Sequence, residues 1–348
     1  MTRSPAPGGT APEPTGPAAV VIDDGEGIDV TPLLDEGETR LRAQVVSANR
    51  FVRDAATHLI EAGGKRFRPM LVGVCGHLGE PDGERLVDAG VVVELVHLAT
   101  LYHDDVMDEA ATRRGVVSAN ARWDNTVAIL TGDYLFARAS ELSAGLGVEV
   151  TRIMARTIAT LCEGQIREIQ GSEGALPPDI PTVEPTVEHY LTVISEKTAS
   201  LIATSCHLGA LLSGCSDEEI EAAARYGWNL GMAFQLSDDV LDIESEATES
   251  GKTPGTDLRQ GVRTLPVIHA LDDDPDGELA ALLTGGNLED AGVARALELL
   301  QASPALDRTR EQAANYAAEA AACLAPFEDG SAVRALRHLA DYTVVRTS

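Results

Sequence analysis

The stretch VVVELVHLATLYHDDVMD (91–108) carries three aspartates, Asp104, Asp105 and Asp108, at the end of a long apolar run. On an α-helix, Asp104 and Asp108 lie one turn apart, and Asp105 is rotated from them by about 100°. The residues before them favour a buried helix rather than a solvated one. This stretch therefore predicts a core helix that ends in a cluster of carboxylates.

A second copy of the pattern lies in WNLGMAFQLSDDVLDI (228–243), which contains Asp238, Asp239 and Asp242. A solvated acidic face is the usual explanation of one such cluster, but it predicts polar neighbours, and here the flanks are hydrophobic. Like charges crowded beside buried surface are costly unless they are paired or bound to metal. Carboxylate oxygens suit Mg²⁺, which bridges to substrate phosphates. We therefore expect all six aspartates to be magnesium ligands.

Basic residues border both aspartate triplets and the glycine pair of GGKRFRP (63–69). Some lysines and arginines at helix ends only offset helix dipoles, which is the competing explanation for Arg66 and Arg259. The others favour a diphosphate site, because basic groups beside aspartates in an acidic chain bind phosphate oxygens well. These candidates are Lys65, Arg68, Arg113, Arg114, Lys197, Lys252 and Arg263.

The composition describes an acidic globular protein of 348 residues, with 27 basic and 55 acidic side chains and a formal net charge of −28. A field of that sign repels nucleic acid, so we expect no nucleic-acid partner. The five cysteines are odd in number and lie in helix-like runs, which predicts buried thiols. The apolar stretch 86–103 contains Asp88, Glu94 and His97, so we expect no transmembrane segment.

The order of elements predicts an all-α fold in one domain. Residues 1–28 are rich in Pro, Gly and Ala without periodicity, which favours a disordered N-terminal tail. They lack the pattern of a signal peptide, so we expect a cytoplasmic protein. Residues 29–348 form the helical domain, with loops at 171–186 and 250–261. No β-hairpin signal is apparent. The expected helices are Leu33–Glu61, Arg68–Leu78, Gly83–Glu109, Ser118–Leu146, Glu149–Gln170, Val187–Ser213, Asp217–Glu246 (with Asp217 as its N-cap) and shorter ones running to Arg346.

Several motifs in this order resemble the trans-isoprenyl (polyprenyl) diphosphate synthases, of long-chain type, over roughly residues 30 to 345. They are GGKRFRP, ELVHLATLYHDDVMD, RRG, GDYLFA, EKTA, FQLSDDVLD and GKTPGTDLRQG followed by TLP. The resemblance implies a single bundle of antiparallel helices around a central cavity, the isoprenoid synthase fold. It also implies a homodimer.

The resemblance assigns roles to individual residues. The six aspartates would hold two or three Mg²⁺ ions on an allylic diphosphate, which Arg113, Lys197 and Lys252 would clamp. Lys65, Arg68, His97 and Arg114 would bind isopentenyl diphosphate. Thr198 and Gln235 would lie near the allylic carbon. The chain departs from the family where Arg263 replaces a lysine before TLP and where VVSAN follows the RRG motif.

The implied reaction is ionisation of an allylic diphosphate, farnesyl or geranylgeranyl, followed by successive 1′-4 condensation with isopentenyl diphosphate. In the family, the fourth and fifth residues before the first aspartate often form the floor of the product cavity. Here they are Thr100 and Ala99, and Thr100 lies about 6 Å below Asp104. Two small residues predict a long product, about C35 to C45, for a quinone side chain. Met154, Ile158 and Leu161 are candidates for the next barrier.

Four alternatives stay open at the level of sequence. A short-chain geranylgeranyl diphosphate synthase would share every motif. A terpene cyclase would share the ionisation step but normally lacks a second DDxxD and has an aromatic-lined pocket, whereas aromatics here are 4%. A metal phosphohydrolase could use His97, His103 and Asp104, and would release phosphate rather than pyrophosphate. A non-catalytic partner subunit should have lost aspartates. A hydrophobic product also suggests peripheral membrane contact during its release.

Overall fold

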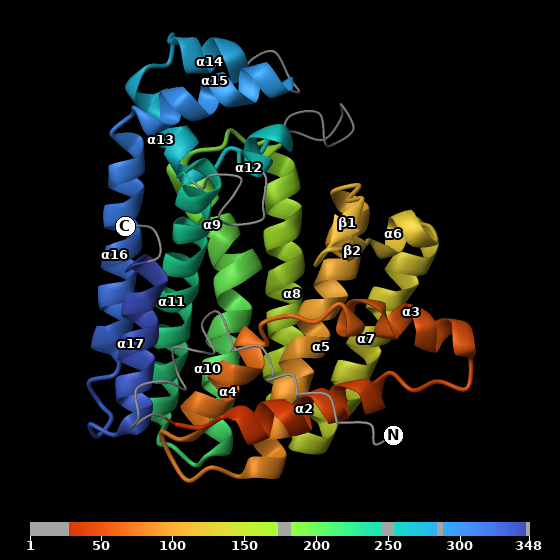
Figure 1. Cartoon of the computed structure of the whole chain (residues 1–348). Coiled ribbons are helices and arrows are strands. Elements are labelled where there is room, and N and C mark those ends of the chain that lie inside the picture. Colours follow the sequence, from red (N-terminus) through yellow and green to blue (C-terminus); the bar gives the residue numbers. More distant parts are fainter. Residues whose placement is uncertain (1–27, 173–181, 245–253, 284–287, 346–348) are drawn as a thin grey trace, which may run out of the picture.

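The computed structural model describes residues 28–172, 182–244, 254–283 and 288–345, and nearly every element in them is a helix (Figure 1). The expected all-α class is confirmed. The elements are α2 (Thr31–Gln44), α3 (Arg50–Glu61), α4 (Phe67–Gly76), α5 (Gly83–Met107), β1 (Thr112–Arg113), β2 (Val116–Val117), α6 (Ala119–Arg122), α7 (Asn125–Leu146), α8 (Val148–Gly171), α9 (Val187–Ile194), the π-helical turn η1 (Ser195–Ala199), α10 (Ser200–Leu212), α11 (Asp217–Glu244), α12 (Thr256–Arg259), α13 (Leu265–Asp273), α14 (Glu278–Leu283), α15 (Asp290–Gln301), α16 (Ala305–Cys323) and α17 (Ser331–Val345).

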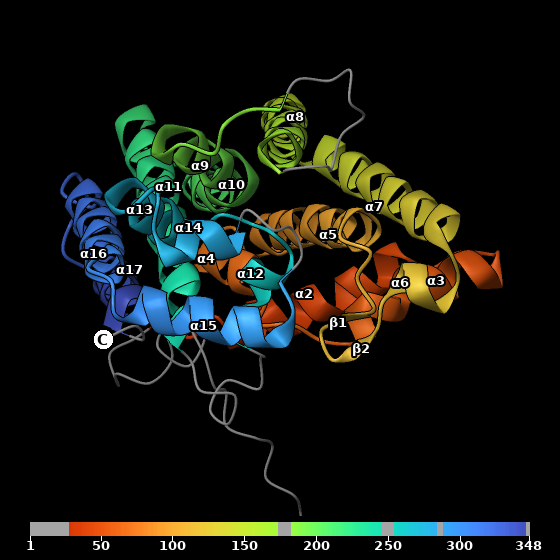
Figure 2. The same cartoon turned by 90° about the horizontal axis from the view of Figure 1, so that it is seen from above.

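The long helices stand side by side and form a bundle, which Figure 2 shows from above. Helix α5 packs against α7 and α10, and α11 packs against α10 and α16. Helix α8 contacts α7 on one side and η1 on the other. Helix α10 thus lies between α5 and α11, and these two carry the aspartate triplets. The bundle places both triplets at the same end of the molecule.

Helix α5 is the apolar centre of this arrangement. By length and composition it could cross a membrane, but 72% of its most apolar window is buried inside the protein. Tyr102 is fully buried, and its hydroxyl donates to the carbonyl oxygen of Ala55 at 2.6 Å. The buried environment explains the apolar sequence, since a helix surrounded by other helices must be hydrophobic on all sides. We therefore describe α5 as a core helix.

Two helices that we expected to be continuous are each broken by an N-cap. Asn49 accepts a hydrogen bond from the backbone N–H of Phe51 at 3.0 Å, so α2 and α3 are separate helices. Asp124 accepts one from Val127 at 2.8 Å, which separates α6 from α7. Asn and Asp favour this position because their side chains satisfy N–H groups that the first turn leaves unpaired. The sequence contained this signal, and our expectation overlooked it.

A β-hairpin follows α5, which corrects the expectation that the chain has no such element. Strands β1 and β2 pair antiparallel, with Arg113 opposite Val116. The two residues between them, Arg114 and Gly115, both have positive φ angles, 52° and 76°. Positive φ at both central residues defines a type I′ turn, the favoured connection of two-residue hairpins. Arg-Gly is an unusual sequence for this turn, because the left-handed conformation is unfavourable for Arg.

Further boundaries differ from the sequence expectation. The cap of α11 is Ser216 rather than Asp217: the Ser216 backbone N–H donates to Glu219 at 2.8 Å, and Ser216 accepts from the Glu219 N–H in return. This is a capping box. The expected loop 250–261 contains the one-turn helix α12. Ile28, the last residue of the predicted tail, is buried in the core; the rest of that tail lies outside the described residues.

The expected helix 187–213 is helical up to Leu212, but it includes the π turn η1. A π turn inserts one extra residue into a helix and often occurs at functional sites. Here it contains Lys197 and Thr198 of the EKTA motif. The extra residue changes the direction of the side chains between α9 and α10. This local irregularity therefore coincides with residues that the sequence marked as functional.

Candidate active site

The first aspartate triplet lies at the end of α5, where the helix leaves the core. Asp108 is the C-terminal cap of the helix, and Asp104 lies one turn before it. Burial raises the pKa of Asp104 to about 6; the charges of Lys197 and Arg113 act in the opposite direction. Burial also raises the pKa of Asp108. The site thus keeps carboxylates in surroundings that disfavour their charge, and it favours a bound cation.

Asp105 differs from the outer two members of the triplet because it points into the protein. It is fully buried, and its Oδ1 accepts a hydrogen bond from Nε of Arg113 at 2.6 Å. Nη2 of Arg113 also lies 3.7 Å from Oδ2 of Asp108. The β1–β2 hairpin therefore brings Arg113 back over the triplet. Oδ2 of Asp105 is buried and has no hydrogen-bond partner.

The second triplet lies on α11 within a chain of hydrogen bonds. Asp239 is buried and accepts from the hydroxyl of Tyr190 and from Nε2 of Gln235, the latter at 3.1 Å. The hydroxyl of Thr198 donates to Oε1 of Gln235 at 3.1 Å. Burial raises the pKa of Asp239 well above its usual value, and the charge of Asp257 adds to this. This network connects α9, η1 and α11.

Asp242, the last member of the second triplet, is engaged by the backbone in this structure. Its two carboxylate oxygens accept from the N–H groups of Thr256 and Asp257, each at 3.1 Å. These two groups belong to the first turn of α12, where unpaired N–H groups attract anions. Asp238 lies half-buried on the same helix. Lys252, the predicted clamp of the allylic diphosphate, lies outside the described residues.

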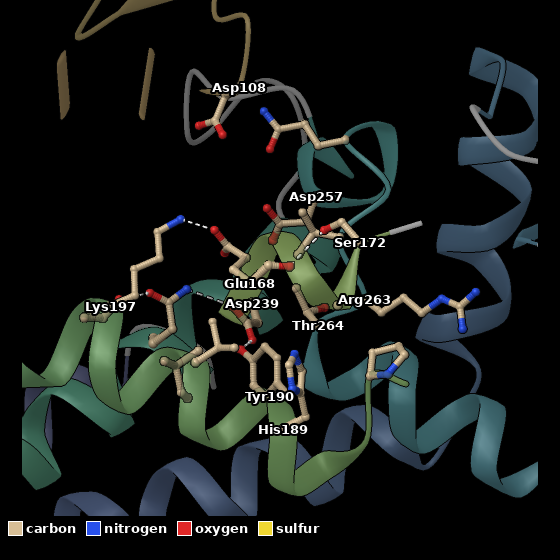
Figure 3. Close-up of a pocket in the computed structure, with 18 residues that line it drawn as sticks. Asp108, Glu168, Ser172, His189, Tyr190, Lys197, Asp239, Asp257, Arg263 and Thr264 are labelled. Carbon is tan, nitrogen blue, oxygen red and sulfur yellow. Dashed lines mark hydrogen bonds and ion pairs between the residues drawn. The ribbon is translucent and has the colours of Figure 1, made fainter. Parts of the chain in front are cut away.

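Both triplets contribute to one cavity of about 250 Å³, here called the polar cavity. Asp108 reaches it from α5 and Asp239 from α11, and Lys197 lines the side of the cavity with its ammonium group directed at Glu168 (Figure 3). The ammonium group of Lys197 pairs with Glu168 of α8. Burial alone would lower the pKa of Lys197, but Glu168 and Asp104 beside it raise the pKa instead. The cavity therefore holds a charged lysine among carboxylates.

The donor set of this cavity fits a divalent cation whose coordination is completed by a ligand. Among the residues that the structure describes, no three His, Cys, Asp or Glu side chains form a ready-made metal site. Hard cations such as Mg²⁺ commonly use one or two carboxylates together with water and substrate phosphates. The raised pKa of Asp104 agrees with this arrangement, because a bound cation would offset the cost of its buried charge.

A cluster of arginines lies below the first triplet. Nε of Arg68 is buried without a hydrogen-bond partner, and burial lowers the pKa of Arg68 to about 10. Burial, together with the charges of Arg68 and Arg114, holds the pKa of His97 well below its usual value, so His97 is neutral. The structure therefore brings Arg68, His97 and Arg114 together, as the sequence predicted. Lys65 lies at the exposed edge of the same turn.

A second cavity of about 510 Å³, here called the apolar cavity, adjoins the polar one. Lys197 and Thr198 line both. The walls of the apolar cavity come from α5, α7, α8 and α10, and include Asp104, Thr100, Leu161 and Leu201. It joins a diphosphate-sized polar region to a mostly hydrophobic space. This is the shape that an amphipathic substrate with a charged head requires.

The residues predicted to limit chain length separate into two groups. Thr100 and Leu161 line the apolar cavity. Ala99 is fully buried in the core and Met154 is 3% exposed, and neither lines this cavity. Ile158 is also absent from its walls. Within the described part of the chain, Thr100 is therefore the better candidate of the predicted pair for contact with a growing product.

Three residues of the polar cavity were missed by the sequence analysis: Glu168, Tyr190 and Asp257. Glu168 pairs with a lysine 29 positions away, and Tyr190 bonds to an aspartate 49 positions away. Neither has a local sequence signal, because each lies in an ordinary amphipathic helix. Asp257 lies in the loop whose basic residues had drawn attention, and its proximity to the second triplet was the available signal.

Comparisons with known proteins agree with this geometry. A family model described as polyprenyl synthetase matches residues 49–300. The nonaprenyl diphosphate synthase of Mycobacterium tuberculosis is 48% identical over 312 residues, covering 89% of this chain and 91% of that protein. A dimethylallyltranstransferase from the same organism is 40% identical, with 87% and 91% covered.

Among solved structures, the polyprenyl synthase of Caulobacter crescentus CB15, complexed with calcium and isoprenyl diphosphate, is similar to this chain. It superposes with a TM-score of 0.84 at 34% identity, covering 92% of this chain and 96% of that one. The fold and the family motifs therefore agree over nearly the whole chain. The chain belongs to the polyprenyl synthetase family and is a chain-elongating prenyltransferase.

Proposed function

We propose that this protein is a magnesium-dependent, all-trans polyprenyl diphosphate synthase. It joins isopentenyl diphosphate to farnesyl or geranylgeranyl diphosphate and repeats this condensation until a long product has formed. The observation that carries the proposal is the polar cavity lined by Asp108 of α5, Asp239 of α11 and Lys197 of η1. Divalent ions held there would stabilise the charge that develops on a departing pyrophosphate.

The chain's own residues would share the work of the allylic site. The outer aspartates of each triplet would hold the metal, and Asp105 and Asp239 would orient the triplets through their contacts with Arg113 and Tyr190. Lys197 would exchange its contact with Glu168 for the diphosphate. Thr198 and Gln235 line the polar cavity, where their dipoles would face the allylic carbon. The Caulobacter relative, solved with calcium and isoprenyl diphosphate, supports a divalent ion in this role.

The second substrate, isopentenyl diphosphate, would bind at the arginine cluster. Arg68 and Arg114 offer guanidinium groups to its diphosphate, and neutral His97 can donate a hydrogen bond without adding charge. Holding both substrates along one cavity turns a bimolecular reaction into a local one. The released pyrophosphate would accept the proton that is lost.

We further propose a product of about C35 to C45, since the small side chain of Thr100, about 6 Å below Asp104, leaves the apolar cavity open. The similarity to the nonaprenyl diphosphate synthase supports a long product, and the dimethylallyltranstransferase is the less similar of the two relatives. The proposal includes a cytoplasmic homodimer that contacts the membrane when it releases its product.

Sizing the dephosphorylated products of purified protein, Mg²⁺, isopentenyl diphosphate and farnesyl diphosphate tests this function. We expect pyrophosphate release and a ladder ending at a long polyprenol. Thr100→Phe should shorten the product by blocking the cavity, whereas Thr100→Val, which keeps the side-chain volume, should not. An unchanged length distribution in the Phe variant would reject Thr100 as a limiting residue.

The same assay discriminates the metal phosphohydrolase. That activity would release inorganic phosphate and would need His97 and His103 near a common metal. In the structure His97 and His103 both line the apolar cavity, but Nε2 of His103 lies 3.1 Å from the carbonyl oxygen of Ile129 and 3.4 Å from Asp133, and the described residues contain no His, Cys, Asp or Glu cluster that could hold a metal. A product ladder together with pyrophosphate excludes this alternative.

A further inference from the structure

We propose that Glu94 is a positioning residue for isopentenyl diphosphate, whose buried carboxylate holds the arginine cluster in the geometry that receives the diphosphate. The inference rests on the proposed function, because it assumes that Arg68 and Arg114 bind this substrate. No motif considered above gave Glu94 a role. It stands out as a carboxylate, only 2% exposed, in the middle of the core helix α5, where its neighbours Val93 and Leu95 are fully buried.

The contacts of Glu94 explain why a charge is retained there. Its Oε1 accepts a hydrogen bond from Nη1 of Arg66 at 2.9 Å and lies 3.6 Å from Nη2 of Arg114. One carboxylate thus bridges two guanidinium groups from different elements, the N-terminus of α4 and the turn of the hairpin. Hydrogen-bonded pairing of this kind is the condition under which a buried charge is tolerated.

Arg66 serves the scaffold rather than the substrate. Its Nε and Nη2 donate to Glu38 of α2 at 2.7 and 3.1 Å, and Nη2 also lies 3.3 Å from the carbonyl oxygen of Ile60. With the bond to Glu94, these contacts engage both ends of the guanidinium fork. Arg66 itself has a left-handed backbone, with φ of 47°. These contacts fix the turn that precedes α4. The first residues of that helix are Phe67 and Arg68, so the turn also sets the position of Arg68.

Arg114 is held from two sides. Its Nη1 donates to the carbonyl oxygens of Leu59 and Gly63, and its Nη2 faces Glu94. The backbone of Gly64 approaches so closely that an added Cβ would lie 2.9 Å from the guanidinium carbon. The position of Arg114 is therefore set by carbonyl oxygens behind it and by the carboxylate beside it.

The charge balance of the cluster indicates where the ligand binds. Arg66, Arg68 and Arg114 face two carboxylates, of Glu38 and Glu94. Arg42 also pairs with Glu38, but Glu61 balances its charge, so one positive charge of the cluster is left unbalanced. Arg68 is the member whose buried Nε lacks a hydrogen-bond partner, and it lines the apolar cavity together with His97. A diphosphate would supply the missing acceptor. Glu94 thus orients two arginines and leaves the third available.

Glu94→Gln keeps the side-chain shape but offers only one acceptor, and its amide N–H₂ would face guanidinium donors. Both arginine contacts use Oε1, so an amide oxygen can occupy the same place, but without the negative charge it holds the more distant guanidinium group, that of Arg114, only weakly. We expect the KM for isopentenyl diphosphate to rise at least tenfold, with less than a twofold change in the KM for farnesyl diphosphate. Titration calorimetry with isopentenyl diphosphate alone should show the same loss of affinity without turnover.

Glu94→Asp keeps the charge but shortens the reach, so it should restore part of the affinity and also provides a folded variant if the Gln variant is unstable. Asp88→Asn is the matched control: Asp88 lies on α5, like Glu94, and pairs with Arg40 of α2 at 2.9 Å, without contacting the cluster. Both KM values should be unchanged in this control.

The outcomes separate the inference from the proposed function. If the wild-type protein forms no prenyl product, the function is wrong. If it does, an equal rise of both KM values in the Glu94 variants, or tighter binding of isopentenyl diphosphate in Glu94→Gln, overturns the positioning role. Tighter binding would mean that Glu94 only weakens a positive field. A selective rise, partly restored by Asp, supports the role.

Discussion

At the scale of single residues, Asp104, which we propose as a metal ligand, carries an energetic cost. Its pKa of about 6 in the folded protein lies above the ordinary value of 3.8 because burial disfavours the charge. For a carboxyl group with a raised pKa, stability is greatest where the group is protonated and falls as the pH rises through the folded pKa. The metal-free protein therefore carries an unfavourable charge at neutral pH.

Asp104→Asn should therefore raise the stability of the metal-free protein at pH 8 by about 1–2 kcal/mol, while it lowers turnover by orders of magnitude. At pH 4.5 Asp104 is protonated in the folded protein but still mostly ionised in the unfolded chain, so the stabilising effect should fall to about a third of its value at pH 8. Denaturant unfolding in EDTA at the two pH values measures this. A variant that is less stable than the wild type at pH 8 would contradict the assignment of the pKa.

At the scale of elements, the contact between α8 and η1 depends on Gly164. A Cβ at this position would lie 2.7 Å from the backbone nitrogen of Lys197 and 2.8 Å from Cβ of Glu196. Gly164→Ala must therefore push η1 away from α8, at a cost of about 1–3 kcal/mol. We expect a several-fold rise in the KM for the allylic diphosphate, because Lys197 moves with η1.

Gly145→Ala on α7 is the matched control for that substitution. No atom lies within 4 Å of its added Cβ, so the change should stabilise the helix by about 0.5–1 kcal/mol and leave both KM values unchanged. Steady-state kinetics and thermal unfolding of the two variants test whether the close contact at Gly164 positions η1. Normal kinetics in Gly164→Ala would show that η1 does not need this close contact.

Also at the scale of elements, there is a physical reason why the sequence predicts some features of the site and not others. The helices, both triplets and the basic residues follow from short-range periodicity and residue chemistry, and the structure confirms the helices. The hydrogen-bond partners of the aspartate triplets do not follow from periodicity or residue chemistry. Asp239 meets Tyr190 across 49 positions, and Asp242 meets the N-terminus of α12 across 14. Such contacts depend on how helices pack, which periodicity does not encode.

At the scale of the whole molecule, a ligand in the polar cavity would connect the carboxylates of α5 with those of α11. No three described acids form a metal site by themselves, and Asp108 and Asp239 belong to different walls of the cavity. We therefore expect Mg²⁺ and pyrophosphate together to raise the melting temperature by about 5 °C at saturating concentrations, since such binding contributes about 2.7 kcal/mol at a hundredfold excess over Kd.

Mg²⁺ alone, or pyrophosphate alone, should shift the melting temperature by less than about 1–2 °C. Pyrophosphate alone meets the carboxylates, and Mg²⁺ alone lacks the oxygens that complete its coordination. Thermal unfolding at pH 8 tests this, with Asp108→Asn as the variant that should lose the joint effect. An equally large shift with Mg²⁺ alone would mean that the protein contains a preformed metal site.

The π turn η1 has a consequence for how this chain can vary over evolutionary time. Each residue in a helix turns the chain by about 100°, so removing the extra residue of η1 would rotate Lys197 and Thr198 relative to α10. Single-residue deletions between 195 and 199 should therefore be far more harmful than most substitutions in α10. Among descendants of this gene, the length of that segment should stay constant even where its amino acids change.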